Sequence, residues 1–290
     1  MEAEQLGRQI LHTCEQALGP DDSLTLDALR NLGGILSQLG DHEQSEQLER
    51  KGLARSRLTR NREQELWAVN QIAMQRMLQD DAEGANKLLA EAVPSAALEF
   101  GAESSLVLWT QRIWARALAD LDQLERAETL AKSTLEHKRL TPDSLGIART
   151  ALILGRVLAQ QNKLAEAEPL LQEALTFFRE HPIGKRDALA VQAANWLGAI
   201  RVAGKAYREA EKLLLSGSDE LFAPAAEMSP TERRLAVSHL VSLYKAWGNP
   251  QETAVWQTKL DALASKSAQK QGRDIPNGGL IRDRGVREER

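Results

Sequence analysis

Four arginines in the middle of the chain are the residues whose type and spacing could do chemistry with a ligand: Arg112, Arg116, Arg149 and Arg156. A guanidinium group can donate two parallel hydrogen bonds to one carboxylate, so clustered arginines predict a site for an acidic group. Two asparagines and two tryptophans accompany them: Asn70, Asn195, Trp67 and Trp109. An asparagine amide can hold a peptide backbone, and tryptophan beside charge is typical of a binding hot spot. These eight residues are the candidate site, and its chemistry is recognition.

The rest of the sequence lacks the arrangements that catalysis needs. The five histidines are far apart, and no pair has the spacing of metal ligands. Cys14 has no activating partner nearby, and neither Gly33-Gly34 nor the stretch from Gly198 to Gly204 forms a phosphate loop. Carboxylates are numerous, but they are typical of helix caps and solvated faces. We therefore expect no catalytic residue, no metal and no cofactor, and a protein that is not an enzyme.

Composition and charge narrow the class of protein further. The chain has 290 residues, a net charge of −4 and a single cysteine. A charge this mild does not predict binding to nucleic acid or to a membrane surface. One cysteine excludes an internal disulfide framework and suits a reducing compartment. The sequence begins without a signal peptide, and no apolar run approaches the roughly 18 residues that span a bilayer. We expect a cytoplasmic protein.

A recurring pair of small residues indicates which elements position the candidate site. In the clearest copy, Gly155 and Ala167 lie twelve residues apart, on two amphipathic stretches of helical period joined by a short polar turn. The second member recurs at steps of 40 to 43 residues: Ala3, Ser45, Ala85, Ala127, Ala167, Ala210 and Thr253. The first member precedes six of these by twelve residues: Gly33, Ala73, Ala115, Gly155, Gly198 and Val241. Because small residues let two helices approach closely, the pattern predicts stacked helical hairpins.

Six complete hairpins are predicted, with no sheet between 20 and 264. Their helices are expected at Ser23–Leu39 and His42–Arg57, Glu63–Gln79 and Ala82–Phe100, Ser104–Ala119 and Gln123–Leu140, Ser144–Gln160 and Leu164–Arg179, Asp187–Ala203 and Tyr207–Phe222, and from Ser229 to a turn at Gly248 and on to Ala264. Residues 1–20 hold a lone second helix, which either caps the array or continues something longer. Residues 21–264 form the hairpins, and 265–290, poor in apolar residues, are predicted to be a disordered tail.

The repeated sequence pattern resembles that of a known family. The small pair, the large residue before its first member and the Ala-Glu-x-Leu that starts at its second member, as in 167–170, resemble the tetratricopeptide repeat (TPR). The period near 42 residues and the sequences of 167–175 and 18–22 are similar to the longer repeat of kinesin light chain. The resemblance covers residues 2–264 and implies an all-α, right-handed superhelical solenoid of helical hairpins. Val241, Thr253 and Pro94 depart from the pattern.

The same resemblance implies where a ligand would bind. In a TPR-like solenoid the first helices of successive hairpins line a concave groove, on the side that flanks the packed small residue. The eight candidate residues occupy positions on that side. The four arginines lie close together there, on hairpins three and four. We therefore expect a non-catalytic interaction scaffold that holds an extended peptide or partner protein, acidic to neutral in charge. The competing interpretation is that these arginines are solvated or paired with glutamates of adjacent helices.

Two further hypotheses concern the ends of the array. Residues 240–260 resemble the last repeat of bacterial proteins in which such arrays follow a serine/threonine kinase domain. The alternative function is therefore the non-catalytic C-terminal TPR region of such a kinase or related signalling protein, since no kinase motif is present. At the other end, the missing first helix leaves Leu6, Ile10, Leu11 and Leu18 without a natural partner on one side. This predicts self-association through that edge, or fraying of residues 1–18.

Overall fold

The structure, a computed structural model, describes residues 2–182, 188–222 and 228–273, and these contain helices and no β-strand. The all-α prediction is thus confirmed. The helices follow one another as α1 (Glu2–Ala17), α2 (Ser23–Gln38), α3 (His42–Leu58), α4 (Arg62–Leu78), α5 (Ala82–Phe100), α6 (Ser105–Asp120), α7 (Leu124–Lys138), α8 (Ser144–Gln160), α9 (Leu164–Glu180), α10 (Ala188–Ala203), α11 (Tyr207–Leu215), α12 (Ser218–Leu221), α13 (Pro230–Trp247) and α14 (Pro250–Arg273).

Most helix ends agree with the sequence, including both ends of α5, and the second helices of hairpins five and six differ. The second helix of hairpin five stops at Leu215 and resumes as α12. Between them, a Cβ on Gly217 would lie 2.4 Å from Val191 Cγ2, so the break lies where the backbone approaches α10 closely. Helix α5 continues through Pro94, although proline removes one hydrogen bond from the ladder. Helix α14 extends past the expected end at Ala264 to Arg273; Asp187 and the predicted tail beyond Arg273 lie outside the described residues.

The small-residue pairs lie where the two helices of a hairpin cross. Ala73, Ala85, Ala115 and Ala127 have no exposed surface. A Cβ on Gly155 would lie 2.7 Å from Leu171 Cγ and 3.3 Å from the Ala167 carbonyl oxygen, so α8 and α9 are in close contact there. In the first hairpin the Ser45 hydroxyl donates to the Gly33 carbonyl at 2.8 Å. The periodic signal in the sequence is therefore a packing signal.

Each hairpin turn contains one residue with positive φ, which lets the chain reverse within a few residues: Gly40, Asp80, Asp122, Asn162, Lys205 and Gly248. Many first helices begin at a side-chain cap. Asp22, Asn61, Ser104 and Asp143 each accept a hydrogen bond from a backbone N–H of the first turn. Ser229 and Glu232 form a complete capping box at the start of α13. Short turns and caps keep successive helices antiparallel and in register.

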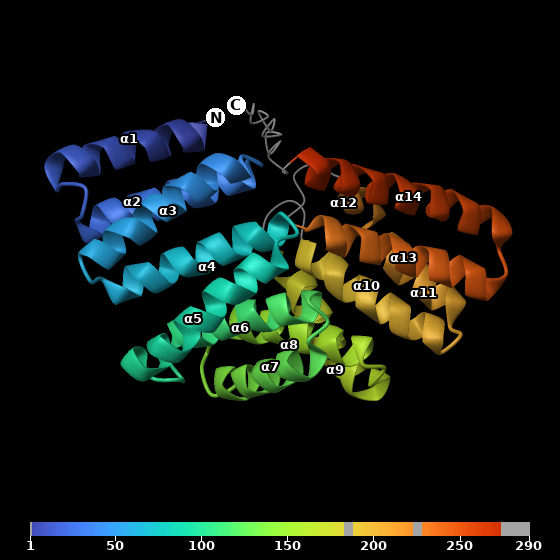
Figure 1. Cartoon of the computed structure of the whole chain (residues 1–290). Helices are drawn as coiled ribbons and strands as arrows, with labels where there is room; N and C mark the ends of the chain where they lie inside the picture. The colour runs from blue at the N-terminus through green and yellow to red at the C-terminus, as the bar shows by residue number, and fades with distance from the viewer. Residues whose placement is uncertain (1, 183–187, 223–227, 274–290) are drawn as a thin grey trace, which may run out of the picture.

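The hairpins stack side by side, and the array curves as it goes (Figure 1). The largest buried cluster joins α6 to α10 around the fully buried Phe178, and smaller clusters continue it toward both ends. The curvature brings the start of α13 beside the turn between α4 and α5 (Figure 1), where the Thr231 N–H donates to Asp80 at 3.0 Å. Within the described residues, no helix combines the length and apolar character that crossing a bilayer requires.

Candidate ligand-binding face

Four of the eight predicted site residues line one pocket of about 350 Å³. They come from three successive first helices: Trp67 from α4, Trp109 and Arg112 from α6, and Arg149 from α8. The remaining lining residues are Glu63, Ser105, Leu106, Lys138, Asp143, Leu145 and Gly146. We refer to this feature as the Trp–Arg pocket. It combines an aromatic wall with three cationic side chains, Arg112, Arg149 and Lys138, and two carboxylates, Glu63 and Asp143.

The aromatic wall is built from stacked groups on three helices. The ring centroids of Trp67 and Trp109 lie 4.5 Å apart, with the planes tilted by 50°. The guanidinium carbon of Arg30, on α2, lies 4.6 Å from the centroid of the Trp67 ring, a cation–π distance. Arg30 in turn forms an ion pair of 2.8 Å with Asp27. The two tryptophans are therefore fixed by contacts within the protein, and they offer a pre-formed apolar surface.

Arg112 is the most perturbed cation of the pocket. Burial, together with the positive charges of Arg149 and Arg116, lowers the pKa of Arg112 to about 9, while the charge of Asp143 acts in the opposite sense. Among the ion pairs found in the described part of the chain, none includes Arg112. A half-buried guanidinium next to other cations is electrostatically costly. An anionic ligand would remove that cost.

The sequence did not single out Lys138 and Asp143. Lys138 ends α7, a second helix, so a reading restricted to first helices missed it; its ammonium is buried and forms an ion pair with Asp143. Asp143 caps α8 by accepting from the Gly146 N–H at 2.8 Å. Burial would raise the pKa of Asp143, but the hydrogen bonds from Lys138 and Gly146 and the charges of Lys138 and Arg112 hold it below its usual range. The cap signal at Asp143 was visible in the sequence; its place in the pocket was not.

Arg116 and Arg156 point into a different environment. The Arg116 Nη2 lies 2.8 Å from Glu232 Oε1, and the Arg156 Nη1 lies 3.9 Å from the same oxygen. Arg156 also forms an ion pair with Asp120 at the end of α6. The sequence placed Arg156 on an exposed face, whereas the structure leaves it only 6 % exposed. The competing interpretation expected a glutamate from an adjacent helix, but Glu232 belongs to α13, two hairpins beyond α8.

Asn70 and Asn195 are buried and packed between helices. The Asn70 amide donates to the Thr110 hydroxyl at 2.9 Å and is fully buried. Asn195 contacts the Ala236 carbonyl and the ring of His239, tying α10 to α13. Burial, with a smaller effect of the Arg156 charge, lowers the pKa of His239 to about 4, so this imidazole is neutral at pH 7. In this conformation neither asparagine is open to a ligand, unlike the expectation from the sequence.

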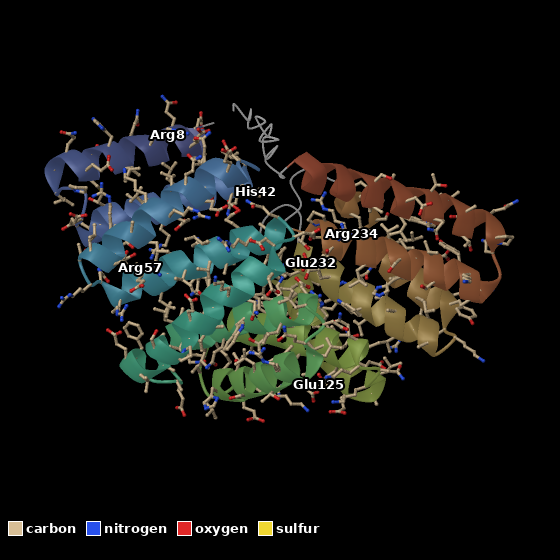
Figure 2. All side chains as sticks on the ribbon, in the orientation of Figure 1. Arg8, His42, Arg57, Glu125, Glu232 and Arg234 are labelled. Atoms are coloured by element: carbon tan, nitrogen blue, oxygen red, sulfur yellow. The ribbon has the colours of Figure 1, made fainter. Side chains whose placement is uncertain are left out.

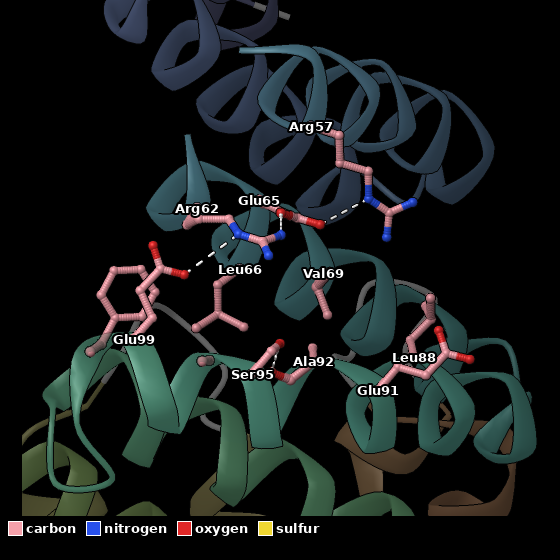
Figure 3. A pocket seen from close by; sticks show the side chains of 12 residues that line it. Arg57, Arg62, Glu65, Leu66, Val69, Leu88, Glu91, Ala92, Ser95 and Glu99 are labelled. Atoms are coloured by element: carbon pink, nitrogen blue, oxygen red, sulfur yellow. Dashed lines mark hydrogen bonds and ion pairs between the residues drawn. The ribbon is translucent and has the colours of Figure 1, made fainter. Parts of the chain in front are cut away.

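A second pocket, of about 100 Å³, lies between α3, α4 and α5 (Figure 3). Leu66, Val69 and Ala92 form part of its apolar lining, and four of its charged residues, Arg57, Arg62, Glu65 and Glu99, pair with one another across the opening (Figure 3). Glu65 lies 2.6 Å from Arg62 and 2.9 Å from Arg57, and Arg62 lies 3.5 Å from Glu99. With two arginines against three glutamates in its lining, this pocket does not favour an acidic ligand. In the described residues no cluster of histidine, cysteine or carboxylate side chains could hold a metal.

Comparison with known proteins agrees with the helical pattern. The family model described as "Tetratricopeptide repeat" matches residues 1–57 and 107–180. No curated protein matches the chain in sequence. Residues 1–57 and 107–180 thus match the tetratricopeptide repeat in sequence, and the described part of the chain folds as an all-α solenoid of helical hairpins.

Solved TPR structures share this fold at low sequence identity. A Rap protein, solved in complex with competence and sporulation factor, superimposes with a TM-score of 0.67 at 14 % identity, over 92 % of this chain and 81 % of that one. BtubC (BKLC) from P. vanneervenii has a TM-score of 0.54 at 14 % identity, over 100 % and 98 %. TPR-like repeats of a kinesin-light-chain-like protein of Podosopora anserina reach 0.50 at 18 %, over 70 % and 96 %. These likenesses establish the TPR solenoid fold and nothing finer.

The TPR match also locates the candidate residues within the array. All four arginines lie inside the second matched segment, 107–180, which covers most of α6 and all of α7, α8 and α9. Trp67, Asn70 and Asn195 lie outside both matched segments. The Trp–Arg pocket therefore combines residues of a recognisable TPR pair with a tryptophan from the less regular hairpin before it.

Proposed function

We propose that this TPR array is a non-catalytic scaffold that binds an extended peptide of a partner protein in the Trp–Arg pocket. A carboxylate of the peptide would be held by Arg112 and Arg149, and a neighbouring apolar side chain would pack on Trp67 and Trp109. The observation that carries the proposal is Arg112, a half-buried cation beside Arg149 for which no ion pair is seen within the described residues. Its pKa of about 9 keeps it charged at neutral pH.

The known structures add support at the level of fold. The Rap protein of similar fold was solved with a bound factor, so an array of this type can hold a ligand. The identity of 14 % supports no transfer of that ligand to this chain. The proposed specificity therefore rests on the pocket residues alone. The resemblance of 240–260 to kinase-linked arrays, and the cytoplasmic location, remain predictions from the sequence.

The proposal is tested with labelled peptides in which glutamate or aspartate lies beside a tryptophan, phenylalanine or leucine. Fluorescence anisotropy compares the wild-type protein with Arg112→Ala, and with Arg50→Ala as a matched control. Arg50 is an exposed arginine of α3 that pairs with Glu46 of the same helix. Loss of a charge-assisted contact of about 1.5–3 kcal/mol corresponds to a 10- to 150-fold weaker affinity for Arg112→Ala, with no change for the control.

Two further observations would accompany binding at this site. Affinity should fall with added salt, and exchange of the acidic residue for glutamine should cost about as much as Arg112→Ala. Circular dichroism should show an unchanged fold for Arg112→Ala, since the wall of the pocket is held by other contacts. Peptides that bind equally well to both proteins would place the ligand site elsewhere on the array.

A further inference from the structure

The start of α13 contacts a part of the array that lies about 150 positions earlier in the sequence. The Thr231 N–H donates to Asp80 Oδ1 at 3.0 Å, and Arg234 Nη2 lies 3.2 Å from Asp80 Oδ2. Asp80 occupies the turn between α4 and α5, with a φ of +66°. In a solenoid each repeat normally contacts its immediate neighbours. Here hairpin six contacts hairpin two directly.

Glu232, in the same turn of α13, extends this contact to hairpins three and four. Its Oε1 atom lies 2.8 Å from Arg116 of α6 and 3.9 Å from Arg156 of α8. Its other oxygen accepts from the Ser229 N–H at 2.9 Å, which completes the capping box of α13. Glu232 is 5 % exposed. Figure 2 shows Glu232 and Arg234 at the centre of the molecule, between the two ends of the array.

One short segment thus bridges three hairpins that are distant in sequence. We call the contacts of Thr231, Glu232 and Arg234 with Asp80, Arg116 and Arg156 the clasp. Because hydrogen bonds and ion pairs at buried positions are costly to leave unmade, the clasp favours the closed curvature of the array. It also presents a carboxylate of the protein itself to two of the four arginines that the sequence assigned to a ligand.

We propose that the clasp is an autoinhibitory contact in which Glu232 holds Arg116 and Arg156 in place of an acidic ligand. In the closed array a ligand reaches Arg112 and Arg149 of the Trp–Arg pocket, while Arg116 and Arg156 are held by Glu232. Release of α13 opens the groove and removes the Glu232 carboxylate from Arg116, which lies beside Arg112, so an acidic segment spanning hairpins three and four binds more tightly. This deepens the proposed function and rests on it. Closure then reduces ligand affinity by the fraction of molecules that are open.

The chain offers two variants that weaken the clasp with little other change. Glu232→Gln removes the charge facing the arginines but keeps the capping box, because glutamine fulfils the same role at that position. Asp80→Asn removes the charge facing Arg234, and asparagine tolerates positive φ as aspartate does. Asp122→Asn is the matched control. Asp122 occupies the equivalent turn of hairpin three, with a φ of +58°, and is solvent-exposed.

The experiment measures closure and binding separately on the full chain. Spin labels at Glu83 and Lys245, both exposed, report the distance between hairpins two and six in a Cys14→Ser background. A fluorescein-labelled hexaglutamate peptide reports affinity. We expect both clasp variants to lengthen or broaden the distance distribution and to bind hexaglutamate at least five-fold more tightly, the lower end of typical coupling between sites. Asp122→Asn should change neither quantity.

The Asp80→Asn result decides between autoinhibition and a simple charge effect, since Asp80 pairs with Arg234 and not with the candidate arginines. Unchanged distances in both variants would refute the clasp. A longer distance with unchanged or weaker peptide affinity would refute autoinhibition. If Arg112→Ala weakens binding but neither clasp variant strengthens it, the proposed function stands and this inference fails. If hexaglutamate binds to no variant, autoinhibition fails, while the proposed function is decided by its own peptides, which add an apolar residue for Trp67 and Trp109.

Discussion

Glu49 is a carboxyl group buried between helices α2 and α3 without a full set of partners. It is 2 % exposed, and its Oε1 atom has no hydrogen-bond partner among the described residues. Its position explains why Gly33 is glycine, since a Cβ there would lie 2.4 Å from that oxygen. Burial raises the pKa of Glu49 to about 8 despite the attraction of Arg30, so the group is mainly protonated at pH 7 in the folded protein.

The pKa of Glu49 predicts a specific dependence of stability on pH. The unfolded chain ionises near pH 4.5, whereas the folded chain holds the proton until about pH 8. The folded state therefore binds more protons between these values, and the free energy of unfolding falls as the pH rises through this range. Glu49→Gln does not titrate, so its advantage over wild type should grow from pH 5 to pH 8 and then stay constant. Between pH 5 and pH 9, the difference in free energy of unfolding between Glu49→Gln and wild type should grow by at least about 1.4 kcal/mol, which corresponds to one pKa unit.

Urea unfolding at pH 5, 7 and 9 measures this effect. Glu43→Gln is the matched control, an exposed glutamate in the first turn of the same helix. Its free energy of unfolding should differ from wild type by no more than a few tenths of a kcal/mol at each pH. If Glu49→Gln follows the wild-type profile across this range, the carboxyl group is not protonated in the folded protein.

At the scale of helices, two glycines with the same conformation should respond to the same change in opposite directions. Gly155 lies where α8 crosses α9, and a Cβ there would meet Leu171 Cγ at 2.7 Å. Gly34 lies inside α2 with no atom within 4 Å of such a Cβ. Gly155→Ala should therefore destabilise the protein, because overpacking of about 1–3 kcal/mol outweighs the gain in helix propensity. Gly34→Ala should stabilise it by about 0.5–1 kcal/mol.

Chemical denaturation of the two variants checks this pair. Both substitutions change the unfolded chain equally, so the difference between them isolates packing at the helix crossing. Equal stabilisation by both would show that α8 and α9 can move apart at no cost. That result would remove the physical basis for the small-residue pairs on which the repeat assignment depends.

At the scale of the whole molecule, stability should vary along the array. The first helix, α1, packs on α2 and leaves Leu6 and Ile10 about half exposed, whereas α8 lies between α7, α9 and α10. In a linear array the terminal element opens at a lower free energy than the centre. Hydrogen exchange should therefore be faster in α1 than in α8 for a monomer. If analytical ultracentrifugation shows a dimer, α1 should become protected and Ile10→Glu should reverse both effects.

A monomer whose α1 amides are protected as strongly as those of α8 would contradict this prediction. It would also exclude the two outcomes expected from the sequence, fraying and self-association through this edge. The exposed surface of α1 would then be a tolerated feature of the array's end, as scattered surface apolar residues are in many proteins.

The sequence by itself determined the repeating unit. Helix type, hairpin boundaries and the crossing of small pairs such as Gly155 and Ala167 depend on residues close together in the chain, and their periodicity records that packing. The Trp–Arg pocket was partly predictable for the same reason. Trp67, Trp109, Arg112 and Arg149 occupy related positions of neighbouring hairpins, so the repeat register brings them to one face.

Only the tertiary structure determined which groups Arg116, Arg156 and Asn195 contact. Asn195 contacts α13 of the next hairpin, whereas Arg116 pairs with α13 three hairpins further along and Arg156 pairs with the end of α6. Whether hairpin six reaches Asp80 depends on the small rotation between successive hairpins, summed over the array. A change of a few degrees per repeat would separate these groups, and no local sequence pattern records that sum. The curvature of the whole solenoid therefore determines which arginines a ligand can reach.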